Sequence, residues 1–220
     1  MTTDICPTIT AYDSSMYLSQ ISRLTPFAKR IHIDLCDGVF APTNTIDPDK
    51  IWWPGGLRAD IHVMYKDPST VFDIIRALGP QLVIVHAEAD GDFGQMAENL
   101  HKHGVEVGVA LLPNTSLNEL IPALSIIDHI LIFSGNLGHQ GGSTADLKLL
   151  DKAREARSRK PSLEIGWDGG VNENNIQHIV DAGVDVINVG GFIQQSHDPK
   201  HAYDVLTALT ERKGLPNGSV

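Results

Sequence analysis

The sequence predicts an α/β fold, a single (β/α)8 TIM barrel, from three observations. Eight short apolar runs rich in β-branched residues recur along the 220 residues, amphipathic segments lie between most of them, and no glycine-rich dinucleotide turn follows the first run. Strands that alternate with helices form parallel βα units. Eight such units in a chain of this length favour a closed barrel over an open doubly wound sheet.

The predicted strands are ICPTI (5–9), IHIDL (31–35), ADIHVM (59–64), LVIVHAE (82–88), VEVGVALL (105–112), HILIFS (129–134), LEIGWD (163–168) and VDVINVG (184–190). The predicted helices are 68–78, 94–103, 116–124, 145–157, 173–182 and 199–212. The segment 41–57 is rich in Pro, Asn, Asp and Gly, which predicts a long loop with at most a short helix. We expect one domain, 1–220, with a frayed tail at 213–220.

Composition excludes several classes of function. The formal net charge of −10, without a Lys/Arg cluster, disfavours a nucleic-acid partner. No apolar run approaches the roughly 20 residues that a membrane helix needs. Cys6 and Cys36 lie in apolar strands and no signal peptide precedes them, so we expect no disulfide and a cytoplasmic location.

Polar side chains stand at the carboxyl ends of apolar strands, where barrel active sites lie. His32 and Asp34 are two residues apart and therefore face the same side of their strand. For this pair alone, the favoured interpretation is structural: a histidine inside the barrel that is hydrogen-bonded to a neighbouring carboxylate. Because His62 ends the next strand and Asp168 ends the seventh, four strong ligands converge, and we expect a metal site.

Two imidazoles and two carboxylates form a mixed nitrogen and oxygen shell. Such a shell suits one divalent ion of Zn, Fe, Mn or Co better than Mg or Ca, which prefer more oxygen ligands. A bound cation with nearby acid and base groups suits proton abstraction beside a carbonyl. His86, with Glu88 nearby, has two interpretations: a residue behind the ligands that orients them, or a satisfied core histidine. The core interpretation is favoured, so His86 is left out of the predicted site.

Three glycine pairs follow the last three strands, and they predict a phosphate site. Bare backbone lets amide groups approach phosphate oxygens, and barrels commonly bind phosphate with their last loops. The pairs are Gly141 and Gly142, Gly169 and Gly170, and Gly190 and Gly191.

A series of sequence pieces between about residue 5 and residue 209 matches a known family in order and spacing: PTIT, HIDLCDGVFAP, DIHVM, VHAE, VGVALLPNT, SGNLG, WDGGV and GVDVINVGG. Through these pieces the chain resembles the ribulose-phosphate 3-epimerase family. The resemblance implies a ribulose-phosphate-binding barrel enzyme, an isomerase of carbohydrate and pentose phosphate metabolism that forms a homo-oligomer. Its expected reaction is metal-dependent epimerisation at C3 of a phosphorylated ketose, D-ribulose 5-phosphate to D-xylulose 5-phosphate.

By the same resemblance, His32, Asp34, His62 and Asp168 hold the metal. Asp34 and Asp168 are also the catalytic pair: one removes the C3 proton and the other returns a proton on the opposite face of an enediolate. Thr8, where the family has serine, and Met64 belong to the substrate pocket, together with the six glycines.

The departures from the family pattern concern the substrate pocket. Cys36 and Phe133 replace two methionines, the loop after the sixth strand reads LGHQGG instead of PGFGGQ, and Gly191 stands where serine is common. Trp167 replaces a small aliphatic residue, and strand alternation directs it toward the helices.

These departures leave two alternatives open. One is a 3-epimerase of a hexulose phosphate such as D-allulose 6-phosphate, and the other is a catalytically silent paralogue that binds a sugar phosphate. The Asp-x-Lys-x-x-Asp motif of related decarboxylases would require lysine at Cys36 and aspartate at Val39, so that group is excluded.

Overall fold

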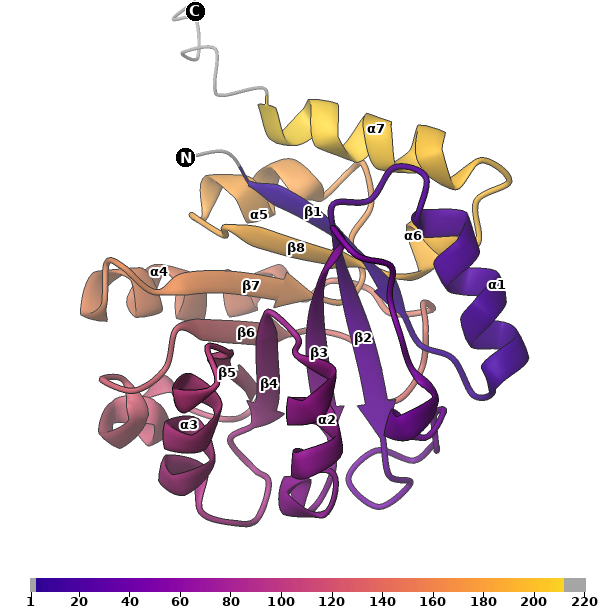
Figure 1. Cartoon of the computed structure of the whole chain (residues 1–220). Helices are drawn as coiled ribbons and strands as arrows, with labels where there is room; N and C mark the ends of the chain where they lie inside the picture. The colour runs from indigo at the N-terminus through magenta and orange to yellow at the C-terminus, as the bar shows by residue number, and fades with distance from the viewer. Residues whose placement is uncertain (1–2, 212–220) are drawn as a thin grey trace, which may run out of the picture.

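The structure, a computed structural model that describes residues 3–211, is a closed barrel of eight parallel strands. Each strand pairs with the next along the chain, and β1 pairs with β8 to close the sheet (Figure 1). The strands are β1 (Asp4–Ile9), β2 (Arg30–Cys36), β3 (Arg58–Met64), β4 (Leu82–His86), β5 (Glu106–Leu111), β6 (His129–Phe133), β7 (Glu164–Asp168) and β8 (Val186–Val189). The predicted (β/α)8 TIM barrel is confirmed.

Helices surround the sheet on its outer side (Figure 1). They are α1 (Ser14–Leu24), α2 (Phe72–Leu78), α3 (Phe93–Lys102), α4 (Leu150–Arg159), α5 (Ile176–Asp181), α6 (Gly191–Gln194) and α7 (Pro199–Glu211). Four 3-10 helices are η1 (Pro48–Lys50), η2 (Pro68–Thr70), η3 (Leu117–Ala123) and η4 (Leu147–Leu149). Within residues 3–211, none of the helices has the length and apolar character needed to cross a bilayer.

Helix α1 was not among the predicted helices, although its signals are present in the sequence. The Asp13 carboxylate caps it by accepting a hydrogen bond from the Met16 amide at 2.8 Å. Tyr17, Ile21 and Leu24 recur at helical spacing and are buried.

The segment 116–124 was predicted as an α-helix and forms the 3-10 helix η3 instead. Pro122 lies inside the segment and lacks the amide hydrogen that a continuing α-helix needs. The loop 41–57 is confirmed, since it holds only the short helix η1. The tail predicted at 213–220 lies outside the described residues.

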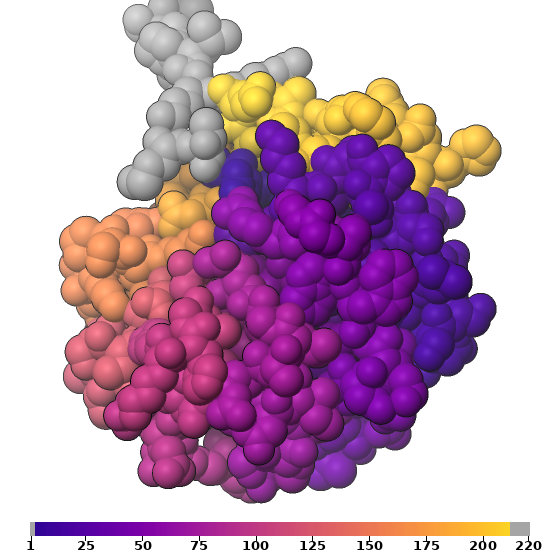
Figure 2. Space-filling model, in the orientation of Figure 1, coloured from indigo at the N-terminus to yellow at the C-terminus, as the bar shows by residue number. Residues whose placement is uncertain are grey.

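The two ends of the described chain meet at one side of the barrel. Helix α7 packs beside β1 and α1, and the yellow and indigo surfaces adjoin in the space-filling view (Figure 2). This closure brings the loop after β8 next to the loop after β1.

Side chains alternate between two environments along each strand. On β2, Ile31, Ile33 and Leu35 join the apolar core between strands and helices, whereas His32 and Asp34 belong to the opposite face, inside the barrel. Trp167 also joins the outer core and is fully buried, as predicted.

The barrel interior is filled in layers. A small apolar cluster of Leu82, Ile84, Ala110 and Leu131 occupies the middle. It lies between the polar residues at the carboxyl ends of the strands and a charged network at their amino ends.

Arg30 is the centre of this charged network. Its guanidinium donates to Asp60 at 2.7 Å and to both carboxylate oxygens of Glu164 at 2.9 Å. The ring of His129 lies 2.8 Å from the same Glu164 carboxylate. Burial raises the pKa of Asp60 although Arg30 opposes this shift. The arginine therefore compensates carboxylates that would otherwise be buried without a partner.

We expect Arg30→Met to lower the free energy of unfolding by about 3–5 kcal/mol, because it leaves the Asp60 carboxylate buried and unpaired. Arg58→Met is the matched control, since Arg58 is half-exposed and lies 3.6 Å from an equally exposed Asp4. It should change stability by less than about 1 kcal/mol. Urea unfolding measures both variants, and equal losses would contradict the role of the network.

Candidate metal and substrate site

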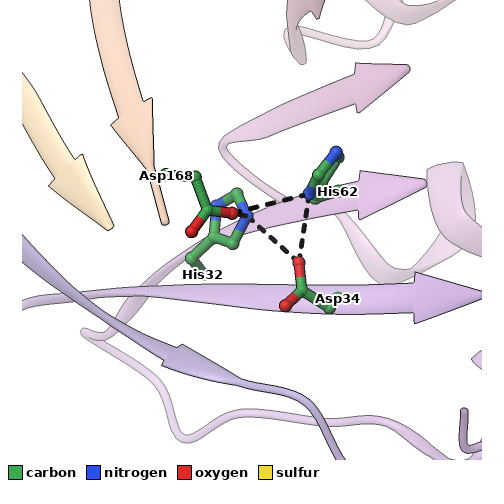
Figure 3. Close-up of side chains that lie close together, drawn as sticks. All are labelled: His32, Asp34, His62 and Asp168. Carbon is green, nitrogen blue, oxygen red and sulfur yellow. Dashed lines mark hydrogen bonds and ion pairs between the residues drawn. The ribbon is translucent and has the colours of Figure 1, made fainter. Parts of the chain in front are cut away.

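The four predicted metal ligands meet at the carboxyl end of the barrel. His32 and Asp34 extend from β2, His62 from β3 and Asp168 from β7, and their side chains point toward one another (Figure 3). In the β2–β3 register Asp34 lies beside His62. One ligand atom from each residue lies within 4.8 Å of all the others, and all four residues are buried.

The distances between these atoms suit a small cation. Asp34 Oδ1 is 3.0 Å from His62 Nδ1 and 3.3 Å from His32 Nε2. Asp168 Oδ2 is 3.7 Å from His32 Nε2 and 4.0 Å from His62 Nδ1. A tetrahedral site with bonds of about 2.1 Å has ligand atoms about 3.4 Å apart. The four atoms could therefore contact one ion after small side-chain adjustments.

His32 supplies a second argument for a metal. Both of its ring nitrogens are buried and lack a hydrogen-bond partner within residues 3–211. A buried polar atom without a partner is costly, and a bound cation would satisfy Nε2. The two carboxylates would neutralise the charge of a divalent ion. His32, Asp34, His62 and Asp168 therefore form a set of ligands that fits one divalent metal ion.

The two carboxylates have opposite acidities. Burial alone raises the pKa of Asp34, but the neighbouring His32 imidazole and the hydrogen bond with His62 outweigh burial and lower that pKa well below its usual value. Burial and the nearby Asp34 charge raise the pKa of Asp168 to about 7. One carboxylate is thus ionised and the other readily holds a proton, which is the division of roles that an acid and base pair needs.

The two histidines differ as well. Burial lowers the pKa of His62 to about 3, despite its hydrogen bond with Asp34. For His32, burial is outweighed by the nearby Asp34 carboxylate at 3.3 Å and by the charge of Asp168, which raise its pKa. His62 is therefore a neutral imidazole, the form that binds metals.

Thr10 positions Asp34, and sequence reasoning missed it. The Thr10 hydroxyl donates to Asp34 Oδ2 at 2.7 Å, and both groups are buried. Thr8 and Thr10 are two residues apart at the end of the first strand, and Thr8 pairs with His32 in the β1–β2 register. This spacing was the available signal, because it directs both hydroxyls to the interior.

A cavity of about 240 Å³ opens beside the four ligands and is lined by Asp34 and Asp168. Every residue predicted to contact substrate also lines it, namely Thr8, Met64, Gly141, Gly142, Gly169, Gly170, Gly190 and Gly191. Of the two replaced methionine positions, Phe133 faces the cavity, while Cys36 is buried with its Sγ 4.0 Å from Met64 Sδ.

The glycines play different structural parts. Gly170 has a φ of +69°, and a Cβ there would lie 2.1 Å from the Ala145 amide nitrogen, so the fold itself requires glycine. Gly190 has a φ of −88°, and a Cβ there would meet only the flexible side chain of Gln140 and Thr8, at 3.2 Å or more. Within residues 3–211, the amides of Gly141, Gly142 and Gly170 donate to no other backbone group. These three amides are therefore available to donate hydrogen bonds to an anion.

His86 is buried, as expected, but it also contacts the site. Its Nε2 lies 2.9 Å from Nε2 of the candidate ligand His62. The interpretation of His86 as a core residue outside the site was therefore incomplete. The VHAE segment held the signal, since strand alternation directs a histidine at the end of β4 into the barrel.

Comparison with known proteins connects this site to one family. The profile of the Ribulose-phosphate 3 epimerase family matches residues 4–193. The ribulose-phosphate 3-epimerase of Helicobacter pylori strain J99 is 29% identical over 208 residues, which are 92% of this chain and 95% of that protein. The enzyme of the same name from Escherichia coli K12 is 30% identical and covers 91% of this chain and 92% of its own length.

Solved structures support the fold. The 3-hexulose-6-phosphate synthase of Salmonella typhimurium superposes with a TM-score of 0.71 at 12% identity, covering 96% of this chain and 98% of its own. The 3-keto-L-gulonate-6-phosphate decarboxylase of Vibrio cholerae gives a TM-score of 0.67 at 11% identity, with 96% and 99% coverage. At these identities the likeness concerns the barrel architecture alone.

We expect the protein to bind about one Zn²⁺ per chain, with an affinity that rises as pH increases from about 5 to about 7. Below about pH 7 the metal must displace a proton from Asp168, whose pKa is about 7, and from His32, whose pKa is also raised. Competition with a fluorescent chelator across this pH range measures the affinity.

Asp168→Asn is the control for this pH dependence. The amide cannot hold the competing proton, so this variant should bind Zn²⁺ more weakly and with a flatter pH profile. An unchanged wild-type affinity down to pH 5 would refute the competition between metal and protons.

Proposed function

The chain belongs to the ribulose-phosphate 3-epimerase family, and from this we propose that it interconverts D-ribulose 5-phosphate and D-xylulose 5-phosphate by epimerisation at C3. The observation that carries the proposal is the pair of buried carboxylates, Asp34 and Asp168, which have opposite acidities and share one cavity with two histidines. The family is metal-dependent, and this chain has a buried group that suits one metal ion.

Epimerisation requires removal of a proton from carbon and its return on the opposite face. We propose that one of Asp34 and Asp168 removes the C3 proton and that the other returns one. Their places on β2 and β7, at separate sides of the barrel mouth, support approach from two faces. Thr10 holds the Asp34 carboxylate through its hydroxyl, which limits that carboxylate to one orientation.

A C3 proton is too weakly acidic for a carboxylate alone. A divalent ion held by His32, Asp34, His62 and Asp168 would supply positive charge that stabilises the developing negative charge on the substrate oxygens beside C3. The low exposure of the two aspartates strengthens every charge interaction there, because little water screens it.

The phosphate group of the substrate is assigned to the glycine turns after β6, β7 and β8. The free amides of Gly141, Gly142 and Gly170 support this assignment, since backbone amides bind phosphate without adding a counter-charge. The relatives described above carry the name ribulose-phosphate 3-epimerase, which favours a five-carbon substrate over a hexulose phosphate.

We expect the wild-type enzyme to turn over D-ribulose 5-phosphate faster than D-allulose 6-phosphate, and to place deuterium at C3 of the product in D₂O. The returned proton comes from a carboxyl group that exchanges with solvent, so the label must enter. Coupled assays and NMR of the product measure both results. Epimerisation without deuterium at C3 would exclude the two-base scheme.

Asp34→Asn and Asp168→Asn test the roles of the two carboxylates. Each should lower kcat by roughly 10²–10⁴-fold or more, because each loss removes an acid or base and also a candidate ligand. The surface variant Asp151→Asn is the control, since Asp151 lies on the outer helix α4. A variant that lacks only the returning acid should still exchange the C3 proton of the substrate while forming little epimer. Wild-type rates in both variants would remove the assignment.

Gly190→Leu should raise KM for the phosphorylated ketose by about tenfold or more while leaving metal content unchanged, because the side chain would occupy phosphate space. Gly190 is a better test than Gly170, where a side chain would clash with backbone. Gly55→Leu is the control, since a Cβ there meets no atom within 4 Å. Steady-state kinetics measure the effect, and an equal loss with the dephosphorylated sugar would argue against a phosphate site.

A further inference from the structure

A line of hydrogen-bonding groups extends from the candidate ligand His62 away from the cavity. His62 Nε2 and His86 Nε2 are 2.9 Å apart, and the two rings are nearly parallel, at 27°. On the far side of His86, Nδ1 lies 3.3 Å from Glu88 Oε2. Neither of these two atoms has a hydrogen-bond partner within residues 3–211. They therefore face each other as an isolated pair.

Glu88 is itself held in place. Its Oε1 accepts hydrogen bonds from the Thr115 hydroxyl and, at 3.1 Å, from the Leu112 amide. The Lys152 ammonium binds three carbonyls of the same loop, those of Leu112, Pro113 and Thr115, at 2.7–2.9 Å. This loop, fastened to helix α4, fixes the position of the carboxylate. Burial raises the pKa of Glu88, but its hydrogen bonds lower that pKa overall, so the group is ionised at neutral pH.

The contacts on each side determine where the protons lie. One proton must occupy the gap between the two Nε2 atoms, because two bare nitrogens at 2.9 Å would repel. If His62 carries that proton, then Nδ1 of His62 is bare, as metal binding requires, and His86 carries its own proton on Nδ1, pointing at Glu88. If His86 carries it on Nε2, His62 donates Nδ1–H to Asp34 at 3.0 Å, and a neutral His86 presents a bare Nδ1 to the ionised Glu88 carboxylate at 3.3 Å. Asp34 therefore favours the second arrangement when no cation is bound, whereas Glu88 favours the first, which a cation on Nδ1 requires.

We propose that His86 and Glu88 are positioning residues that stabilise the His62 tautomer with a bare Nδ1, the form that binds the metal, against the pull of Asp34 on the Nδ1 proton. The inference rests on the proposed metal centre and extends it to two residues that touch neither metal nor substrate. Carboxylates and carbonyls that fix the tautomer of a ligating histidine are general features of metal sites. Here the carboxylate acts through a second imidazole.

The aromatic surroundings of His86 support a fixed orientation. The rings of Phe40 and Phe133 lie 4.7 and 5.7 Å from the His86 ring, centroid to centroid. Within this packing only 2% of the His86 surface is exposed. A ring enclosed in this way keeps Nε2 directed at His62 and Nδ1 directed at Glu88.

We expect His86→Leu to weaken Zn²⁺ binding by about 10–100-fold, since the His62 Nε2–H loses its acceptor. His86→Gln should recover most of the affinity, because its side-chain oxygen can accept that proton. Glu88→Gln, which keeps both histidines and nearly the same volume, should weaken Zn²⁺ binding as well. Competition with a chelator on the full chain, stripped of metal and reloaded with Zn²⁺ alone, measures each affinity.

His129→Leu is the matched control for loss of a buried histidine. His129 also lies inside the barrel and pairs with a carboxylate, Glu164, at 2.8 Å, but on the charged network at the other end. It should lose stability without losing Zn²⁺ affinity. Thermal unfolding of every variant separates the two effects.

NMR of ¹⁵N-labelled histidines provides a readout that a purely structural role would not change. In the metal-free wild type, the Nε2–H form of His62 should be populated alongside the Nδ1–H form that Asp34 favours, and Glu88→Gln should shift population toward the Nδ1–H form. An unchanged tautomer population in Glu88→Gln would overturn the inference, and so would wild-type Zn²⁺ affinity in folded His86→Leu. Absence of Zn²⁺ binding by the wild type would instead overturn the metal centre, and the positioning role with it.

Discussion

The period of two along a parallel strand, combined with closure of the sheet, is the constraint on which the rest of this protein depends. It assigns Ile31, Ile33 and Leu35 to the layer under the helices and sends His32 and Asp34 into a closed interior that water barely reaches. Polar groups there must satisfy one another. The barrel gathers these polar groups at its two ends and fills the middle with Leu82, Ile84, Ala110 and Leu131.

The two polar ends of the barrel interior compensate their buried charges in different ways. At the amino ends, Arg30 compensates the charges of Asp60 and Glu164 with direct ion pairs. At the carboxyl ends, the two buried carboxylates share two histidines, and the His32 ring nitrogens have no hydrogen-bond partner within residues 3–211. Such an arrangement gains free energy when a cation binds, and burial with the Asp34 charge raises the pKa of Asp168 to about 7. The unfavourable electrostatics of two buried, adjacent carboxylates are therefore the source of the chemistry of the site.

The glycine turns show how fold and function share residues. Gly169 and Gly170 adopt positive φ and lie against neighbouring backbone, so the chain needs glycine there to close its loops. The same bare backbone exposes amides to the cavity. Gly190 has a negative φ and does not lie against backbone, so the fold does not require glycine there. We attribute the glycine to the open space that it leaves beside Thr8 and Gln140. A ligand with several oxygens fits this combination of free donors and open volume.

The sequence by itself determined the eight strands, the barrel and the four candidate ligands, because these follow from local periodicity and from residue types at strand ends. It also placed Trp167 toward the helices and Ala41–Leu57 in a loop without a long helix. Only the tertiary structure decided which interior groups touch. The Thr10 hydroxyl reaches Asp34, His86 reaches His62, and Arg30 joins Asp60 to Glu164, all between residues at least 24 positions apart. The alternation of side chains along a strand predicts that these residues point into the barrel. The register and closure of the sheet determine which atoms come within hydrogen-bonding distance and how far burial shifts each pKa.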